Sequence, residues 1–89
     1  MIALAEILRI EGYKFYIPSL DHDPAHVHVK KGDFTTRIDI SGDEAVWMAG
    51  EESNPAAQDR ELRKVAISIA NQNLIELKRR WEGIDRGRQ

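Results

Sequence analysis

The sequence of 89 residues contains no cysteine. This absence excludes a disulfide scaffold, thiolate zinc sites, iron–sulfur clusters and a cysteine nucleophile. A chain of this length buries only about 60–65% of its unfolded surface. Without disulfides, packing, dimerisation or docking on a partner has to supply the stability. Two separate domains would need roughly 100 residues each, so we expect a single domain over residues 1–89.

Long apolar segments are also missing from the chain. No run approaches the roughly 18 apolar residues that a membrane-spanning helix requires. Residues 1–6 include no basic residue and no long apolar stretch, unlike a secretory signal. Hydrophobic residues make up 42% of the chain and charged residues 31%, which is typical of a soluble globular domain. We therefore expect a cytoplasmic protein without a membrane partner.

The net charge of −2 is unevenly distributed along the chain. Residues 1–57 contain five Lys/Arg and ten Asp/Glu, a balance of −5, whereas residues 58–89 contain eight and five, a balance of +3. One explanation of the basic end is a helix C-terminus, whose dipole favours cations. The other is a local contact with RNA, DNA or an acidic partner, since a pI near 5.9 argues against general DNA binding.

Two β-hairpins are predicted in the first half of the chain, where apolar and polar residues alternate. A two-residue loop at Glu11-Gly12 places Ile10 opposite Tyr13 in the first hairpin.

A second two-residue loop, at Gly32-Asp33, closes the second hairpin, and glycine in its first position favours a type II′ turn. Its register gives one apolar and one polar face. The apolar face consists of Val27, Val29, Phe34, Ile38 and Ile40. The polar face consists of His26, His28, Lys30, Thr35, Arg37 and Asp39.

From about Asp59 the apolar residues recur with a period of 3.6, which predicts an amphipathic helix. Ser53 or Asn54 before Pro55, or Asp59 itself, could cap it. We therefore expect an α+β fold: a four- to five-stranded antiparallel meander sheet (strands within about 7–49) with one long C-terminal helix (about 58–83) on one face and a basic tail over 84–89. A helix of roughly 36 Å would overhang strands of roughly 17 Å, which predicts self-association or a partner bound through this helix.

All three histidines lie within seven residues, at His22, His26 and His28. His26 and His28 are two apart on a predicted strand and therefore project from one face, while His22 precedes them in a loop. Imidazole is the commonest protein ligand for zinc and similar ions. His22, His26, His28 and Asp39 are therefore candidate ligands of a divalent metal, with structural and partner-contact roles as the alternatives.

Two cations flank these histidines on the same predicted face. His26 and His28 would move protons and Lys30 and Arg37 would stabilise a phosphorane, which is the set of groups that a metal-independent ribonuclease uses. These four residues are the candidate catalytic residues. Ordinary cross-strand charge pairing on an exposed sheet is the alternative.

The run from Leu8 to Asp33 resembles the bacterial domain-of-unknown-function 4160 family. The sequences LRIEGYKFY and DHDPAHVHVKKGD carry the resemblance. The family's His-x-Pro-Pro-His-x-His signature is matched at His22, His26 and His28, with Ala25 in place of the second proline. The resemblance singles out these three histidines as the positions of interest.

The family's helix with a Glu-Leu…Trp pattern is matched at Glu76-Leu77 and Trp81. Genes of the family that this sequence resembles often lie beside a second small gene, in arrangements like those of toxin–antitoxin pairs. The resemblance therefore implies a cytosolic interaction protein, one component of a two-gene module that binds its partner. The alternative is a small ribonuclease or metal-dependent hydrolase that uses His22, His26 and His28. Whether the protein is an enzyme stays open at this point.

Overall fold

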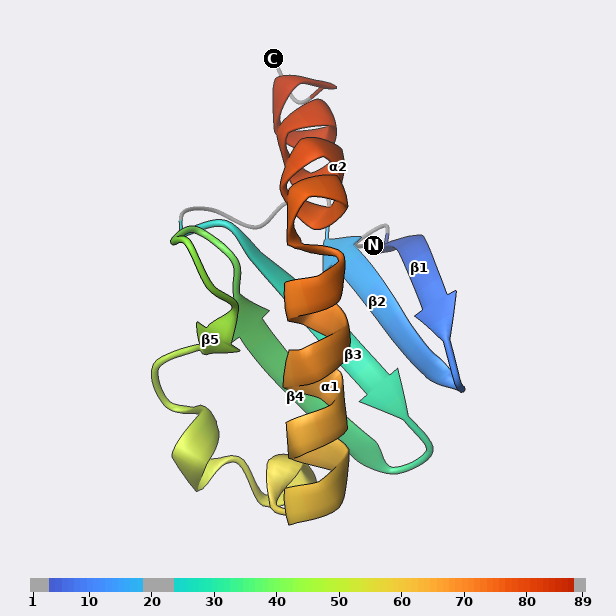
Figure 1. Cartoon of the computed structure of the whole chain (residues 1–89), viewed down its shortest axis with the longest axis vertical. Helices are drawn as coiled ribbons and strands as arrows, with labels where there is room; N and C mark the ends of the chain where they lie inside the picture. The colour runs from blue at the N-terminus through green and yellow to red at the C-terminus, as the bar shows by residue number, and fades with distance from the viewer. Residues whose placement is uncertain (1–3, 19–23, 88–89) are drawn as a thin grey trace.

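The computed structural model describes residues 4–18 and 24–87, together with the side chains of residues 7–17 and 24–83. A five-stranded antiparallel sheet precedes the helices (Figure 1). The elements are β1 (Leu4–Ile10), β2 (Tyr13–Pro18), β3 (His26–Lys31), β4 (Phe34–Asp39), β5 (Val46–Trp47), the short 3-10 helices η1 (Glu51–Ser53) and η2 (Pro55–Ala57), α1 (Arg60–Gln72) and α2 (Leu74–Gly87). No helix in the described ranges is both long and apolar enough to span a membrane.

The strands follow one another in the sheet in the order of the sequence, so the sheet is a meander. This confirms the expected α+β class. Both hairpins have the predicted registers, with Ile10 opposite Tyr13 and Val27 opposite Ile38. Glu11 and Gly12 have positive φ angles of 51° and 84°, as a two-residue turn between twisted strands requires.

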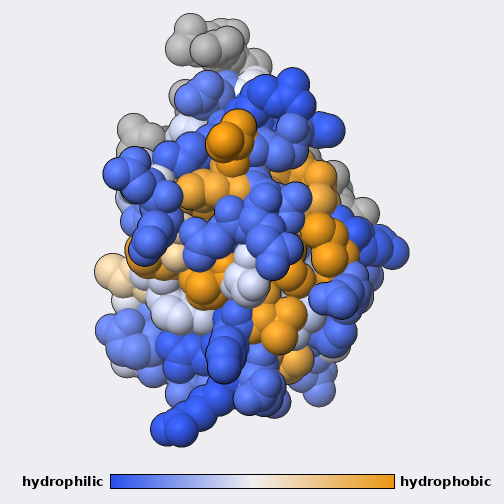
Figure 2. All heavy atoms as spheres, viewed as in Figure 1, coloured by the Kyte–Doolittle hydropathy of each residue, from blue (hydrophilic) through white to orange (hydrophobic). Residues whose placement is uncertain are grey.

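One face of the sheet packs against the helices and forms the core. The fully buried side chains on this face include Phe15, Val29 and Ile38, and α1 contributes Ala66 and Ala70. Part of the apolar side of the predicted helix is therefore buried inside the chain itself: Ala66, Ile69, Ala70, Leu77 and Trp81. Figure 2 shows this side of the molecule as mostly hydrophilic, with apolar groups visible between the polar ones.

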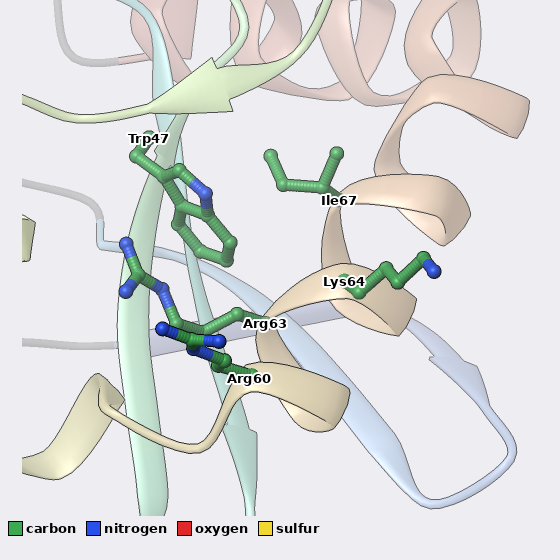
Figure 3. A pocket seen from close by; sticks show the side chains of 5 residues that line it. All are labelled: Trp47, Arg60, Arg63, Lys64 and Ile67. Carbon is green, nitrogen blue, oxygen red and sulfur yellow. The ribbon is translucent and has the colours of Figure 1, made fainter.

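The two tryptophans have different environments. Trp81 of α2 is buried in the core. Trp47 of β5 is half-buried and lies beside α1 (Figure 3).

The prediction of one long C-terminal helix is wrong, because the chain forms two helices that meet at Asn73. The N–H of Asn73 donates to Ile69 O (3.1 Å), and its side-chain Nδ2 donates to the same carbonyl (2.8 Å). An asparagine amide that competes in this way for a helix carbonyl favours the end of a helix. Asp59 caps α1 by accepting a hydrogen bond from Leu62 N–H at 3.1 Å, as expected. Helix α2 extends to Gly87, into the segment expected to be a tail.

Candidate functional site

The sheet face opposite the helices carries the polar residues that the sequence pattern placed there. In one row across three strands, Tyr16 of β2 lies opposite His28 of β3, and His28 lies opposite Arg37 of β4. Tyr16, His28 and Arg37 are each partly exposed. The row therefore presents a phenol, an imidazole and a guanidinium side by side.

The neighbouring row is cationic. Arg9 of β1 lies opposite Lys14 of β2, and Lys14 lies opposite Lys30 of β3. Like charges directly opposite each other on adjacent strands are destabilising. The pairing of Lys14 with Lys30 is therefore unfavourable for the isolated fold and suits contact with a negatively charged molecule. We call the two rows together the polar sheet face: Arg9, Lys14, Tyr16, His28, Lys30 and Arg37.

The two described histidines share a face but differ in burial. His26 is only 3% exposed, and its Nδ1 lies 2.8 Å from Pro24 O. A carbonyl only accepts hydrogen bonds, so Nδ1 carries the proton and the lone pair of the neutral ring is on Nε2. His28 is half-buried, and its ring centroid lies 5.3 Å from that of His26. His26 thus anchors the start of β3, whereas His28 belongs to the partly exposed row that it forms with Tyr16 and Arg37.

The four candidate metal ligands are only partly brought together. His22 lies outside the described residues. Asp39 lies opposite His26 as predicted, and its Oδ1 accepts hydrogen bonds from the N–H and the hydroxyl of Ser41 at 2.8 and 2.6 Å. Within residues 4–18 and 24–87, no group of three His, Asp or Glu side chains could hold a metal ion. The metal prediction therefore depends on His22.

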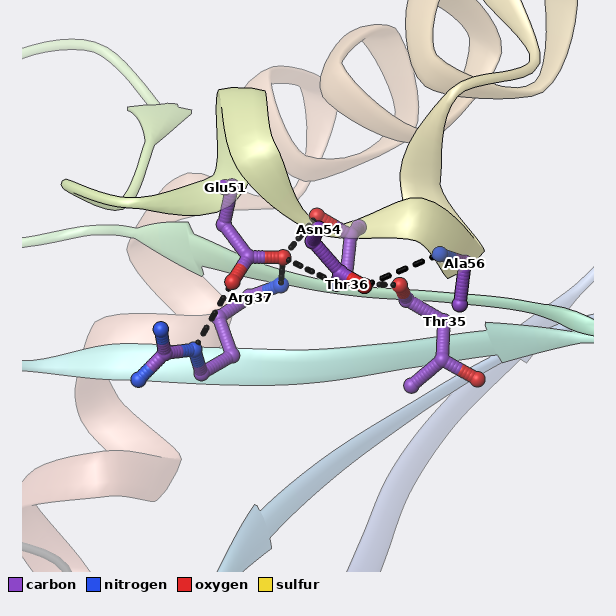
Figure 4. Close-up of polar contacts among 6 residues, drawn as sticks. All are labelled: Thr35, Thr36, Arg37, Glu51, Asn54 and Ala56. Atoms are coloured by element: carbon purple, nitrogen blue, oxygen red, sulfur yellow. Dashed lines mark hydrogen bonds and ion pairs between the residues drawn. The ribbon is translucent and has the colours of Figure 1, made fainter.

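Sequence reasoning missed the buried carboxylate of Glu51, which is 3% exposed. Its Oε1 accepts hydrogen bonds from the Thr36 hydroxyl (2.7 Å), Arg37 N–H (3.1 Å) and Asn54 Nδ2 (2.8 Å). Its Oε2 accepts one from Arg37 Nε at 3.0 Å (Figure 4). Asn54 Nδ2 also donates to Thr35 O at 3.0 Å. The side chains of Glu51 and Asn54 thus hydrogen-bond the backbone of β4 where β5, which has only two residues, no longer pairs with it. They cover a sheet edge that would otherwise be open.

The same carboxylate orients a residue of the polar sheet face. Burial raises the pKa of Glu51, but the hydrogen bonds from Asn54, Thr36 and Arg37 outweigh burial and hold the pKa below its ordinary value. Glu51 is therefore ionised at neutral pH and fixes the guanidinium of Arg37 through Nε. The two terminal nitrogens of Arg37 stay outside this ion pair. No periodicity or motif in the sequence marks Glu51 for this role.

Comparison with known proteins decides the family. The family model described as Domain of unknown function (DUF4160) matches residues 12–82. The chain belongs to the DUF4160 family. The matched region contains the polar sheet face except Arg9, and it contains Glu51 and most of both helices. Neither the curated proteins nor the solved structures gave a significant match.

A first prediction separates the two described histidines of the DUF4160 signature. Replacing His26 by glutamine is expected to lower the free energy of unfolding by about 1–2 kcal/mol, because a buried ring and its hydrogen bond to Pro24 O are lost. His28→Gln is expected to change it by less than about 0.5 kcal/mol. Urea unfolding monitored by circular dichroism measures both. Equal effects of the two substitutions would contradict an anchoring role for His26.

Proposed function

We propose that this protein is a small interaction protein, one component of a two-gene toxin–antitoxin-type module, and that it binds an acidic surface of its partner with the polar sheet face. The observation that carries the proposal is the pairing of Lys14 with Lys30 on adjacent strands. Stability alone disfavours this pairing, and a partner carboxylate between the two ammonium groups would relieve the repulsion.

The charge balance of this face supports an acidic partner. Four of its six residues are cations: Arg9, Lys14, Lys30 and Arg37. By register, two acidic residues border it on the same side of the sheet, Glu6 opposite Tyr16 and Asp39 opposite His26. Asp39 is already engaged with Ser41. The protein as a whole has a net charge of −2, so the polar sheet face is a local cationic surface on a mildly acidic protein. Charge complementarity of this kind provides specificity and a fast association rate.

The arrangement of Arg37 also supports recognition. Long cationic side chains lose rotational freedom on binding, and a side chain held in place beforehand loses less. The buried carboxylate of Glu51 holds Arg37 through Nε. A guanidinium fixed in this way is prepared for a carboxylate of the partner.

The decisive experiment measures binding to the product of the neighbouring small gene by isothermal titration calorimetry. We expect the double variant Lys14→Gln/Lys30→Gln to bind about tenfold more weakly or worse, with a reduced salt dependence. Its free energy of unfolding should be unchanged or higher, because a like-charge pair is removed.

The matched control removes two cations from the helix side of the sheet, in the variant Arg60→Gln/Lys64→Gln. Its affinity for the partner should equal that of the wild type. The proposal is wrong if the neighbour's product does not bind, or if Lys14→Gln/Lys30→Gln binds it as tightly as the wild type. Induced expression with and without the neighbour, scored as growth arrest, then shows which component is the toxin.

One observation favours the hydrolase alternative as a second candidate. His28, Arg37 and Tyr16 form one row, which supplies a proton-transfer group, a cation and a hydroxyl at one place. The burial of His26 weakens this alternative, because a two-histidine mechanism needs both rings at the substrate. The same growth assay discriminates: loss of growth arrest in His28→Gln, with partner binding and folding intact, would favour hydrolysis.

A further inference from the structure

A second cationic site lies on the other side of the sheet, between β5 and α1. A pocket of about 300 Å³ is lined by Trp47, Arg60, Arg63, Lys64 and Ile67 (Figure 3). This volume is at the lower end of the range for small-molecule sites. The lining combines three cations, one aromatic ring and one aliphatic side chain, and none of the five residues is acidic.

The helix spacing explains how these cations come together. Arg60, Arg63, Lys64 and Ile67 are at positions i, i+3, i+4 and i+7 of α1, which fall on one face of a helix. This face adjoins the stripe that α1 buries in the core. In Figure 3, Arg60 and Arg63 extend to the side of Trp47 of β5, whereas the ammonium group of Lys64 points away from the ring. The pocket therefore has a rigid helix on one side and a sheet edge on the other.

The cations of this pocket lie near the N-terminal end of α1. The N-terminal end of a helix has a partial positive charge, which favours carboxylates and disfavours cations. Arg60 is the first residue of α1, and Arg63 and Lys64 follow within the next turn. Asp59 caps this end and Glu61 lies in its first turn, but neither lines the pocket. The pocket lining therefore presents three cations and no carboxylate, which suits an anionic ligand.

Trp47 and Arg63 indicate what kind of anion fits. The guanidinium carbon of Arg63 lies 4.9 Å from the centroid of the Trp47 ring, so a cation and an aromatic ring are already stacked at the wall of the pocket. Planar groups of this type are the surfaces on which nucleic-acid bases stack. Arg60 and Lys64 also line the pocket and are exposed, so these long side chains can reach phosphate groups of a ligand.

We propose that this pocket binds single-stranded nucleic acid, with one base stacked at the Trp47–Arg63 pair and the adjacent phosphates at Arg60 and Lys64. An acidic peptide would satisfy the cations but has no base to stack at the Trp47–Arg63 pair. The inference is independent of the proposed partner binding, because the pocket and the polar sheet face lie on opposite sides of the sheet.

The test uses fluorescence anisotropy of labelled octanucleotides of uridine and of thymidine at low salt, with the full-length chain. Arg60→Gln/Lys64→Gln is expected to bind at least about tenfold more weakly. Its plot of log affinity against log salt should lose a slope of about 1.4, since each phosphate contact on a single strand contributes about 0.7. Its thermal stability should equal or exceed that of the wild type, because cations leave the helix N-terminal end.

Trp47→Leu tests the stacked base separately. It should weaken binding of the octanucleotides by at least about fivefold and leave binding of inorganic tripolyphosphate, which has no base, unchanged. Octanucleotides should quench tryptophan fluorescence in the wild type and lose this effect in Trp47→Leu. Tighter binding of the uridine or of the thymidine octanucleotide would show whether the pocket prefers RNA or DNA.

The matched control is Lys14→Gln/Lys30→Gln, which removes two cations from the polar sheet face and should bind the octanucleotides like the wild type. Three results would overturn the proposal. They are the absence of saturable binding by the wild type, equal binding by wild type and Arg60→Gln/Lys64→Gln, and an octaglutamate peptide that binds as tightly as the octanucleotides with the same dependence on Trp47.

Discussion

Replacing Glu51 by alanine is expected to lower the free energy of unfolding by about 3 kcal/mol, the largest effect we predict for a single polar residue. Removing the carboxylate leaves the buried Thr36 hydroxyl and the Arg37 N–H without their acceptor, and it leaves the Arg37 guanidinium without its counter-ion. The loss is a substantial part of the free energy of unfolding of about 5–13 kcal/mol expected for a domain of this size.

Two further substitutions separate the charge of Glu51 from its hydrogen bonding. In Glu51→Gln, the amide oxygen can replace Oε1 and accept the same three hydrogen bonds, but the amide NH₂ then faces the N–H of Arg37 Nε. We expect a smaller loss, about 1–2 kcal/mol. Glu52→Ala, at the exposed neighbouring position, is the control and should stay within about 0.5 kcal/mol of the wild type. Urea unfolding at pH 7 measures all three, and an alanine variant as stable as the control would contradict the role of Glu51.

The pH dependence of stability follows from the direction of the pKa shift. The pKa of Glu51 is lower in the folded chain than its ordinary value of 4.5, so ionisation of Glu51 stabilises the fold. This contribution is fully present above the unfolded-state pKa and is lost as the pH falls through the folded-state pKa. The difference in stability between wild type and Glu51→Gln should therefore be constant above about pH 6 and shrink below about pH 4.

Replacing Trp81 by alanine is expected to cost about 3–5 kcal/mol, the usual range for removing a buried aromatic side chain. Trp81 is 6% exposed, and Leu77, one turn earlier, is 1% exposed. These two are the buried residues among the described side chains of α2. Truncating one of them is expected to loosen the attachment of α2, which extends beyond the sheet in Figure 1.

Hydrogen exchange distinguishes loosening of α2 from a uniform loss of stability. In Trp81→Ala, the amides of α2 should lose protection more than those of α1 and of β3. Ile75→Ala is the control on the same helix, because Ile75 is 86% exposed and its truncation should change stability by less than about 0.5 kcal/mol. A Trp81→Ala variant with wild-type stability and wild-type protection of α2 would show that α2 is held by other contacts.

Registers and faces were predictable from the sequence because they depend on short-range patterns. Alternation around Gly32-Asp33 places Val27 and Ile38 on the core face and His28 and Arg37 on the other, and a slip by one residue would exchange all of them. The apolar period of 3.6 likewise identified the buried side of the helices. The shared face of His26 and His28, with Arg37 and Asp39 opposite, follows from the same alternation.

The break between the helices was not predictable in this way. Asn73 lies within a region whose apolar period continues from Ala70 to Leu77, so the pattern by itself indicates one helix. An asparagine is tolerated inside helices and weakens them only slightly. Helix α1 ends where the backbone of Asn73 leaves the helical region (φ −120°, ψ 21°), and Asn73 Nδ2 donates to Ile69 O at this point. A local backbone angle and a side-chain rotamer are not encoded in a hydropathy pattern.

The sequence by itself thus determined the meander, the registers and the polar face with its histidines, because neighbouring strands and successive helix turns are close along the chain. Only the tertiary structure decided that His26 is buried while His28 is not. It also decided that Glu51 reaches Arg37 across 14 residues, and that Trp47 meets Arg63 of α1. These contacts depend on how the loop from Gly50 to Asp59 crosses the sheet edge, and no periodic pattern in the sequence specifies that path.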